Sequence, residues 1–241
     1  MELAALKEII ANSRHIVFFG GAGVSTESGI PDFRSAAGLY QKRTKSPYPP
    51  EVMLSHSFFM EHTEQFFEFY LEQMIYKDAR PNQAHIALAQ LELAGRLRAV
   101  VTQNIDGLHQ QAGSRNVLEL HGSVYRNTCM TCSASYNLEY VLLHAVPVPK
   151  CSRCGGTVKP DVVLYEESLD MELLNRARDM IAAADVLIVG GTSLTVNPAA
   201  GLVRQYNGDK LVIINKTPTP FDSRANYLIH GSIGKVLNSI L

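Results

Sequence analysis

The chain has almost no net charge and no long apolar segment. Its 241 residues carry 22 Lys and Arg against 23 Asp and Glu, which gives a formal net charge of -1 at pH 7. This balance offers no bulk electrostatic attraction to nucleic acid or to an anionic membrane. Its apolar runs are far shorter than the roughly 20 residues of a membrane-spanning helix. We therefore expect no membrane segment and find no strong nucleic-acid signal.

An export signal is also missing. Residues 1–10 alternate charged and apolar side chains at helical spacing, without a long apolar core or a small-residue cleavage site. We predict an amphipathic helix there and a cytoplasmic location. A composition of 46% hydrophobic and 19% charged residues is that of an ordinary globular protein, which excludes disorder for a chain of this length.

Cysteine is scarce, and all four cysteines lie in one stretch. Cys129-x2-Cys132 and Cys151-x2-Cys154 are separated by 18 residues, the spacing of a four-thiolate zinc site on two knuckle turns. Four thiolates leave no open coordination position, so we predict a structural metal. The alternatives are four free thiols or two disulfides, and disulfides are disfavoured without an export signal.

Short apolar runs alternate with helical patterns along the chain. The runs lie at residues 16–19, 97–102, 117–120, 162–165, 186–190 and 211–215. The helical patterns lie at residues 83–93, 171–184 and 199–206. This alternation predicts an α/β fold, a parallel sheet with helices on both faces. Residues 36–80, with an aromatic-rich helix that we interpret as core, and residues 124–157, with the cysteines, interrupt it.

A glycine turn follows the first apolar run. Gly21-Ala22-Gly23 between a strand and a helix lets the backbone approach a pyrophosphate, although a turn without a ligand is about as common. The continuation at residues 30–34 is more informative. Asp32, Phe33 and Arg34 provide a carboxylate for a ribose, a ring to cover a flat ligand and a guanidinium for phosphate. The alternative is a surface loop with an internal Asp–Arg salt bridge.

Polar clusters follow five of the apolar runs. They lie at residues 20–23, 102–106, 121–122, 190–193 and 215–216. Because ligands of open parallel sheets bind at the carboxyl ends of the strands, we expect these clusters to form one site. Asn104 and Asp106 taken alone are more often turn or cap residues.

Two features of these clusters indicate the chemistry. The chain lacks the acidic residue that dinucleotide-dependent dehydrogenases place about 20 positions after the glycine turn, so we infer a reaction other than hydride transfer. His121 is the only histidine in the clusters, and a neutral imidazole there can serve as a general base near pH 7.

Taken together, these segments resemble the sirtuins, the NAD-dependent protein-lysine deacylases. The matching segments are residues 21–25, 28–34, 102–106 and 121–122, the two Cys-x2-Cys pairs, residues 191–194 with Val196, and Asn215. The resemblance implies a Rossmann-like NAD-binding domain from residues 1–35, 81–123 and 158–241, a cofactor loop and helical module at 36–80, and a zinc-binding module at 124–157. It also implies NAD as a consumed co-substrate, one structural zinc, and acetylated lysine-containing proteins or peptides as partners.

The resemblance further implies a role for individual residues. The catalytic residues are His121 and Asn104. The cofactor-binding residues are Gly21, Ala22, Gly23, Thr26, Asp32, Phe33, Arg34, Gln103, Asn104, Ile105, Asp106, Gly191, Thr192, Ser193, Asn215, Ser232 and Ile233. The substrate-binding residues are Val163, Leu164, Tyr165 and Val196, and the metal ligands are Cys129, Cys132, Cys151 and Cys154.

The implied reaction begins when the amide oxygen of an acyl-lysine attacks the nicotinamide ribose and expels nicotinamide. His121 then acts as general base on a ribose hydroxyl, and water releases lysine and O-acyl-ADP-ribose. Two alternatives remain open at this point: mono-ADP-ribosyl transfer, which shares the first step, and a non-catalytic NAD-sensing module.

Two departures from the family pattern bear on substrate choice. Tyr165-Glu166-Glu167 stands where sirtuins usually have Phe-Gly-Glu, which removes a glycine and adds a carboxylate, so we expect a bias toward peptides with flanking basic residues. Succinyl-preferring members pair a tyrosine with an arginine three residues later, whereas this chain has Tyr70 and Gln73. We therefore expect acetyl over succinyl groups, with longer apolar acyl groups left open.

Overall fold

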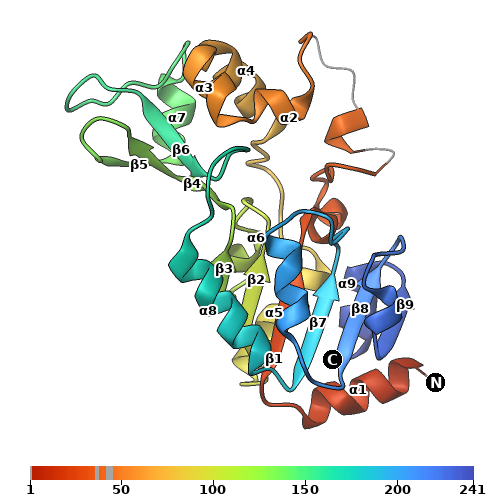
Figure 1. The fold of residues 1–241 in the computed structure, drawn as a ribbon. Coiled ribbons are helices and arrows are strands. Elements are labelled where there is room, and N and C mark those ends of the chain that lie inside the picture. Colours follow the sequence, from red (N-terminus) through yellow and green to blue (C-terminus); the bar gives the residue numbers. More distant parts are fainter. Residues whose placement is uncertain (1, 36–37, 42–45) are drawn as a thin grey trace.

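A six-stranded parallel sheet forms the larger part of the molecule (Figure 1). The computed structural model describes residues 2–35, 38–41 and 46–241. In this part of the chain the strand order is β3-β2-β1-β7-β8-β9. The strands are β1 (Ile16–Gly20), β2 (Leu97–Thr102), β3 (Val117–Glu119), β7 (Val186–Gly190), β8 (Leu211–Asn215) and β9 (Tyr227–His230).

Helices cover both faces of this sheet, as the sequence predicts. Successive side chains of β1 point to opposite faces, so Ile16 and Phe18 pack on one side and Val17 and Phe19 on the other. The first face is covered by α1 (Glu2–Asn12), α5 (Gln83–Leu93) and α9 (Ile233–Ser239). The second is covered by α8 (Met171–Ala182) and the 3-10 helix η3 (Ala199–Gln205). The predicted fold class is confirmed.

A smaller part lies beyond the carboxyl edge of the sheet, at the top of Figure 1. Its antiparallel sheet contains β4 (Gly122–Cys129), β5 (Ser135–Asn137) and β6 (Val158–Val162), in the order β5-β4-β6. Its helices are α7 (Leu138–His144), α2 (Pro50–Met53), α3 (His56–Glu61) and α4 (Thr63–Gln73), with the short 3-10 helix η2 (Leu39–Gln41). One hydrophobic cluster includes Phe59, Phe66 and Phe67 together with Val141 and Val158. The aromatic helix is therefore core, as expected.

Two assignments from the sequence need correction. Residues 162–165 are not a strand of the parallel sheet, because β6 ends at Val162 and pairs antiparallel with β4. The segment 163–165 then runs between the two parts, where Val163 N donates to His121 O at 3.0 Å and Tyr165 N donates to Leu54 O at 3.0 Å. The edge strand β9 was missed, because it is short and only half-buried and so lacks a strong apolar signal.

Other expectations are refined by the structure. Residues 199–205 form a 3-10 helix where a helical pattern was predicted. Residues 36–37 and 42–45 of the predicted loop and helical module, and Met1 of the predicted first helix, lie outside the described residues. In the part of the chain that the structure describes, no helix is both long and apolar enough to cross a membrane.

Gly122, where the chain passes from β3 into β4, offers a test of this packing. It has a φ of +78°, and a methyl group on its Cα would lie 1.8 Å from the carbonyl oxygen of Asp161. Gly95 has a similar φ of +74° with no atom within 4 Å of that position. Gly122→Ala should add a backbone clash of about 2 kcal/mol to the strain that both variants share. We expect its thermal midpoint to lie roughly 4–8 °C below that of Gly95→Ala.

Equal midpoints for Gly122→Ala and Gly95→Ala in calorimetry would contradict this close packing of β4 against β6. The strain of a left-handed backbone cancels in the difference between the two midpoints, because both glycines have a positive φ.

Candidate active site and zinc centre

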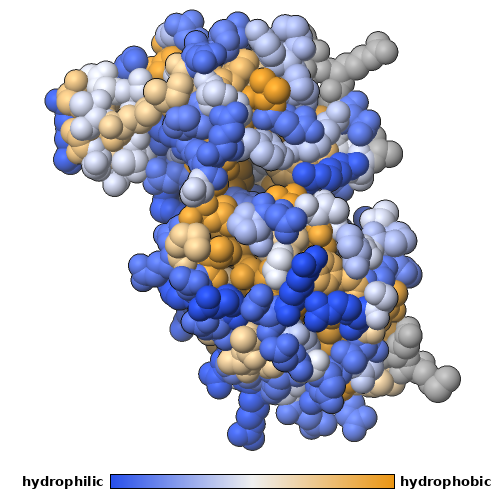
Figure 2. Space-filling view, viewed as in Figure 1, coloured by the Kyte–Doolittle hydropathy of each residue, from blue (hydrophilic) through white to orange (hydrophobic). Residues whose placement is uncertain are grey.

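A cavity of about 780 Å³ lies between the carboxyl edge of the parallel sheet and the smaller part of the molecule. Figure 2 shows apolar side chains in the hollowed region between the two parts. Its size is that of a site for a substantial organic ligand. The polar clusters predicted at the strand ends meet there, because β1 pairs with β2 and β7 in a register that aligns Gly20 with Thr102 and Gly190.

Most of the predicted cofactor and substrate residues line this cavity. They are Gly21, Ala22, Gly23, Asp32, Phe33, Arg34, Gln103, Asn104, Ile105, Asp106, His121, Val163, Leu164, Tyr165, Gly191, Thr192, Ser193, Val196 and Asn215. Thr26, Ser232 and Ile233 are not among the lining residues. The Thr26 hydroxyl donates to Gly23 O at 2.9 Å, and Ile233 packs into the core beneath Gly190.

Two glycine turns meet at the centre of the sheet edge. Gly23 N donates to Gly191 O at 2.8 Å, and a methyl group on Gly23 would lie 2.8 Å from that same oxygen. Gly191 has a φ of +59°. The glycines are therefore required for close approach of the two turns, in addition to any approach to a phosphate. After the turn, the short 3-10 helix η1 (Ala22–Ser28) takes the place of a regular α-helix.

A polar network lies beneath this turn. The Ser25 hydroxyl donates to Asp106 Oδ2 at 2.6 Å and accepts from Asn104 Nδ2 at 3.1 Å. Asp106 Oδ1 accepts from Leu108 N at 2.9 Å, so this carboxylate also caps α6 (Leu108–Gln111). Burial raises the pKa of Asp106 above its ordinary value of 3.8, although the Ser25 bond opposes the shift. No role was predicted for Ser25, whose one signal in the sequence is its place in the Gly-x-Gly-x-Ser match.

His121 is held in one tautomer. Its Nδ1 lies 3.0 Å from Gln103 O, and because a carbonyl only accepts, Nδ1 must carry the hydrogen. A neutral ring then has its lone pair on Nε2, the atom that can take a proton. Burial lowers the pKa of His121 below its ordinary value of 6.5, which keeps the ring neutral near pH 7.

Among the described residues of the loop after the glycine turn, Asp32 and Arg34 form no salt bridge with each other, so the alternative Asp–Arg pair is not found. Asp32 Oδ1 instead accepts from Ser35 N at 2.9 Å. The guanidinium carbon of Arg34 lies 5.4 Å from the centre of the Tyr40 ring, and Phe33 packs against that same ring at 5.6 Å between centroids. The residues predicted to contact NAD are thus organised around Tyr40, which sequence analysis did not select.

The segment predicted to bind peptide is anchored to α3. Leu164 N donates to Glu167 Oε2 at 2.9 Å, and His56 N donates to Tyr165 O at 3.0 Å. Glu166 occupies the usual glycine position with a φ of +74°, a conformation that glycine adopts freely. Its carboxylate accepts from Ser57 N at 2.9 Å and from the Ser57 hydroxyl at 3.0 Å. These bonds lower the pKa of Glu166, so the exposed group stays charged.

The residues that bear on acyl choice both line the cavity. Tyr70 is fully buried and its hydroxyl has no hydrogen-bond partner among the described residues. Burial raises the pKa of Tyr70, so the hydroxyl is neutral. Gln73, three residues later, brings no positive charge to the cavity.

The four cysteines form a compact cluster at the tip of the smaller part. Their sulfur atoms all lie within 4.8 Å of one another, with Cys129 and Cys154 3.5 Å apart and Cys132 and Cys151 3.6 Å apart. A tetrahedral zinc with Zn–S bonds of about 2.3 Å separates its sulfurs by about 3.8 Å. The cluster therefore fits zinc, and the disulfide alternative is excluded because no pair is within bonding distance.

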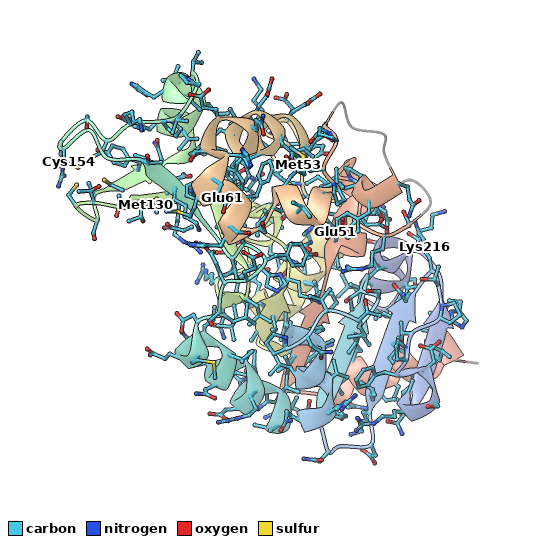
Figure 3. All side chains as sticks on the ribbon, turned by 45° about the horizontal axis from the view of Figure 1, so that its top comes forward. Glu51, Met53, Glu61, Met130, Cys154 and Lys216 are labelled. Carbon is cyan, nitrogen blue, oxygen red and sulfur yellow. The ribbon has the colours of Figure 1, made fainter. Side chains whose placement is uncertain are left out.

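A tyrosine supports this cluster. The Tyr136 hydroxyl lies 3.0 Å from Cys151 Sγ and lowers the pKa of that thiol to about 6, which favours the thiolate that binds metal. Figure 3 places Cys154 at the outer end of the smaller part, away from the parallel sheet. The metal centre is thus remote from the cavity, as expected of a structural site.

Comparison with known proteins gives close matches over nearly the whole chain. Residues 21–198 match the model of the Sir2 family. An NAD-dependent protein deacetylase of Clostridium acetobutylicum is 61% identical over 236 residues, 98% of this chain and 96% of the relative. One from Staphylococcus aureus (strain Mu50) is 44% identical over 240 residues, 100% of this chain and 98% of the relative.

Solved structures agree with these sequence matches. A structure of a Sir2 enzyme is 43% identical with a TM-score of 0.88, covering 99% of this chain and 96% of its own. A Sir2 protein solved with a deacetylated p53 peptide and 3'-O-acetyl-ADP-ribose is 38% identical with a TM-score of 0.90, covering 100% of this chain and 97% of its own.

The metal centre can be tested by removing one ligand. Cys154→Ala should abolish binding of one zinc per chain and lower the thermal midpoint by roughly 5 °C or more, because structural zinc stabilises only the folded state. Met130 is an exposed neighbour that offers no ligand, so Met130→Ala should keep both the bound zinc and the wild-type thermal midpoint. Zinc content by atomic emission and calorimetry provide the measurements. A full zinc complement in Cys154→Ala would contradict the four-thiolate site.

Proposed function

The chain belongs to the Sir2 family, and we infer that it is an NAD-dependent protein-lysine deacetylase. The products are nicotinamide, O-acyl-ADP-ribose and free lysine. The observation that carries this proposal is the half-buried His121, held with its proton on Nδ1 at the sheet edge where the glycine turns and the Ser25 network meet.

The first chemical step replaces the bond from ribose to nicotinamide with a bond from ribose to the acyl oxygen. When bound, NAD supplies the anomeric carbon that the amide oxygen of acyl-lysine attacks as nicotinamide leaves. An amide oxygen is a weak nucleophile, so the protein must orient it and keep water out. Phe33 is suited to exclude water, and the network of Ser25, Asn104 and Asp106 is suited to hold polar groups of the substrate in place.

His121 then has a defined task in this scheme. Its Nε2 carries the lone pair and can accept the proton of a hydroxyl that lies in the cavity. The Gln103 carbonyl stabilises the imidazolium that forms, because it accepts the Nδ1 hydrogen in both states. We propose that the proton comes from a ribose hydroxyl, which would activate it toward the transferred acyl group.

We propose that the acyl-lysine peptide lies between residues 163–165 and Val196, which line the same cavity as the glycine turns. Tyr165 N and O are already bonded to Leu54 and His56, and Val163 N to His121, which leaves the Val163 carbonyl for the peptide backbone. Gln73 in place of an arginine supports acetyl over succinyl groups. The four-thiolate zinc has only a structural role.

The two alternatives are less well supported. Mono-ADP-ribosyl transfer needs no peptide segment beside the base, and a non-catalytic NAD sensor needs no base of fixed tautomer. The deacetylase relatives match nearly the full chain. For the location we propose the cytoplasm, as expected from the amphipathic N-terminal segment, and the absence of disulfides among the four clustered cysteines is consistent with it. Cell fractionation can check this location.

A peptide panel tests the function directly. Acetyl-lysine and succinyl-lysine peptides with basic or acidic flanking residues should be assayed for NAD-dependent release of nicotinamide, O-acyl-ADP-ribose and lysine. We expect the highest kcat/KM for acetyl peptides with basic flanks, because Gln73 cannot pair with a carboxylate and Glu166 stays charged. His121→Ala should lose roughly 10²–10⁴-fold in turnover while still binding NAD.

The proposal fails if succinyl peptides are the better substrates, or if nicotinamide is released equally without acyl peptide while label from NAD appears on protein. Unchanged turnover in His121→Ala would show that His121 is not the general base of the reaction.

The pH dependence follows from the partial burial of His121. The base must be neutral, and desolvation lowers the pKa of His121 below 6.5, so activity should stay level above that value and fall as pH drops through the lowered pKa. The acidic limb of kcat/KM should therefore lie below pH 6.5. A limb centred at or above pH 7, measured with NAD saturating, would contradict the lowered pKa of this ring.

A further inference from the structure

We propose that the Tyr165 hydroxyl is a positioning group that holds the cofactor loop against the peptide-binding segment through a hydrogen bond to the Tyr40 hydroxyl. The proposal rests on the proposed function, because it takes residues 32–34 as NAD contacts and residues 163–165 as peptide contacts. Both tyrosines line the active-site cavity. Their hydroxyl pair joins two segments that are 125 residues apart in the chain.

On the loop side, Tyr40 is coupled to the residues predicted to contact NAD. Leu39 N donates to Asp32 O at 2.7 Å, and Tyr40 N donates to Phe33 O at 2.9 Å. The Phe33 ring and the Arg34 guanidinium both pack on the Tyr40 ring. A change in the position of Tyr40 would therefore disturb the contacts of all three residues of the Asp-Phe-Arg segment.

On the peptide side, the backbone of Tyr165 is fixed. Its N–H and carbonyl are bonded to Leu54 and His56 at 3.0 Å each. The following two residues add side-chain bonds, Glu166 to Ser57 and Glu167 to His56 Nδ1 at 3.0 Å. Because its main chain is fixed by these bonds, the position of the Tyr165 hydroxyl is well defined. This hydroxyl is the atom that distinguishes the chain from a family member with phenylalanine at this position.

The two hydroxyls are suited to a stable bond. Burial raises the pKa of Tyr40, and so does the bond to Tyr165, so Tyr40 is neutral and able to donate or accept. Arg34 lies over the Tyr40 ring and opposes the shift only in part. Because Tyr40 is anchored in the loop and Tyr165 on α3, the bond favours the arrangement in which Phe33 and Arg34 lie at the cavity. It should therefore lower the free-energy cost of holding Phe33 and Arg34 in the position that binds NAD.

The test is a double-mutant cycle on binding. Calorimetric titration with ADP-ribose should be run on the wild type, Tyr40→Phe, Tyr165→Phe and the double variant. We expect each single variant to raise Kd by about two- to tenfold, the range of one hydrogen bond, and the double variant to raise it no further. Tyr125→Phe is the matched control, because Tyr125 lines the same cavity but its hydroxyl is bonded to Gln111 outside the loop.

Turnover separates positioning from a general loss of stability. In steady-state assays KM for NAD should rise in both single variants by about the same factor as the Kd for ADP-ribose, while the thermal midpoint stays within about 2 °C of the wild type. An unchanged Kd in Tyr165→Phe, or strictly additive effects of the two substitutions, would overturn the proposal. A rise of the same size in Tyr125→Phe would also overturn it.

The two proposals can fail separately. ADP-ribose binding needs no turnover, so a wild type that binds it but releases no lysine from acetyl peptides would defeat the deacetylase function and leave the cycle interpretable. Active wild-type enzyme with no coupling between Tyr40 and Tyr165 would defeat only the positioning role.

Discussion

The contact between the two glycine turns, residues 21–23 and 191–192, is the constraint on which the site depends. The bond from Gly23 N to Gly191 O draws the ends of β1 and β7 together at a distance that leaves no room for a side chain on either glycine. The strands are then in register, and the polar residues that follow them lie at one edge. The Ser25 network lies next to this contact and contributes to the lining of the cavity.

The second determinant is the shared core of the smaller part. Aromatic residues of α3 and α4 pack in the same hydrophobic cluster as Val141 of α7 and Val158 of β6. The helical module and the metal-binding strands are therefore one packed unit in the described structure, although they come from separate stretches of the chain. This unit lines one side of the cavity and anchors residues 165–166 through His56 and Ser57. A metal bound by its four cysteines would hold the knuckle turns at the tip.

Much of this could be predicted from local pattern. Apolar runs bounded by glycine and polar residues identified five strands of the sheet, and the cysteine spacing identified the metal cluster. Residues 162–165 were misassigned because an apolar run does not reveal its pairing partner, here β4. Contacts between residues far apart in the sequence could also not be predicted from local sequence patterns. Neither the bond of Tyr40 to Tyr165 nor that of Glu166 to Ser57 has any local signal.

Gly122 has a consequence for the placement of His121. Two of the crossings between the large and small parts lie side by side, since Gly122 pairs with Val162 and Val163 N is bonded to His121 O. The left-handed backbone of Gly122 leaves no room for a side chain beside the Asp161 carbonyl, and His121 is the residue next to it. The imidazole is therefore attached to the chain where the two parts are hydrogen-bonded to each other, so its position is tied to both walls of the cavity at once.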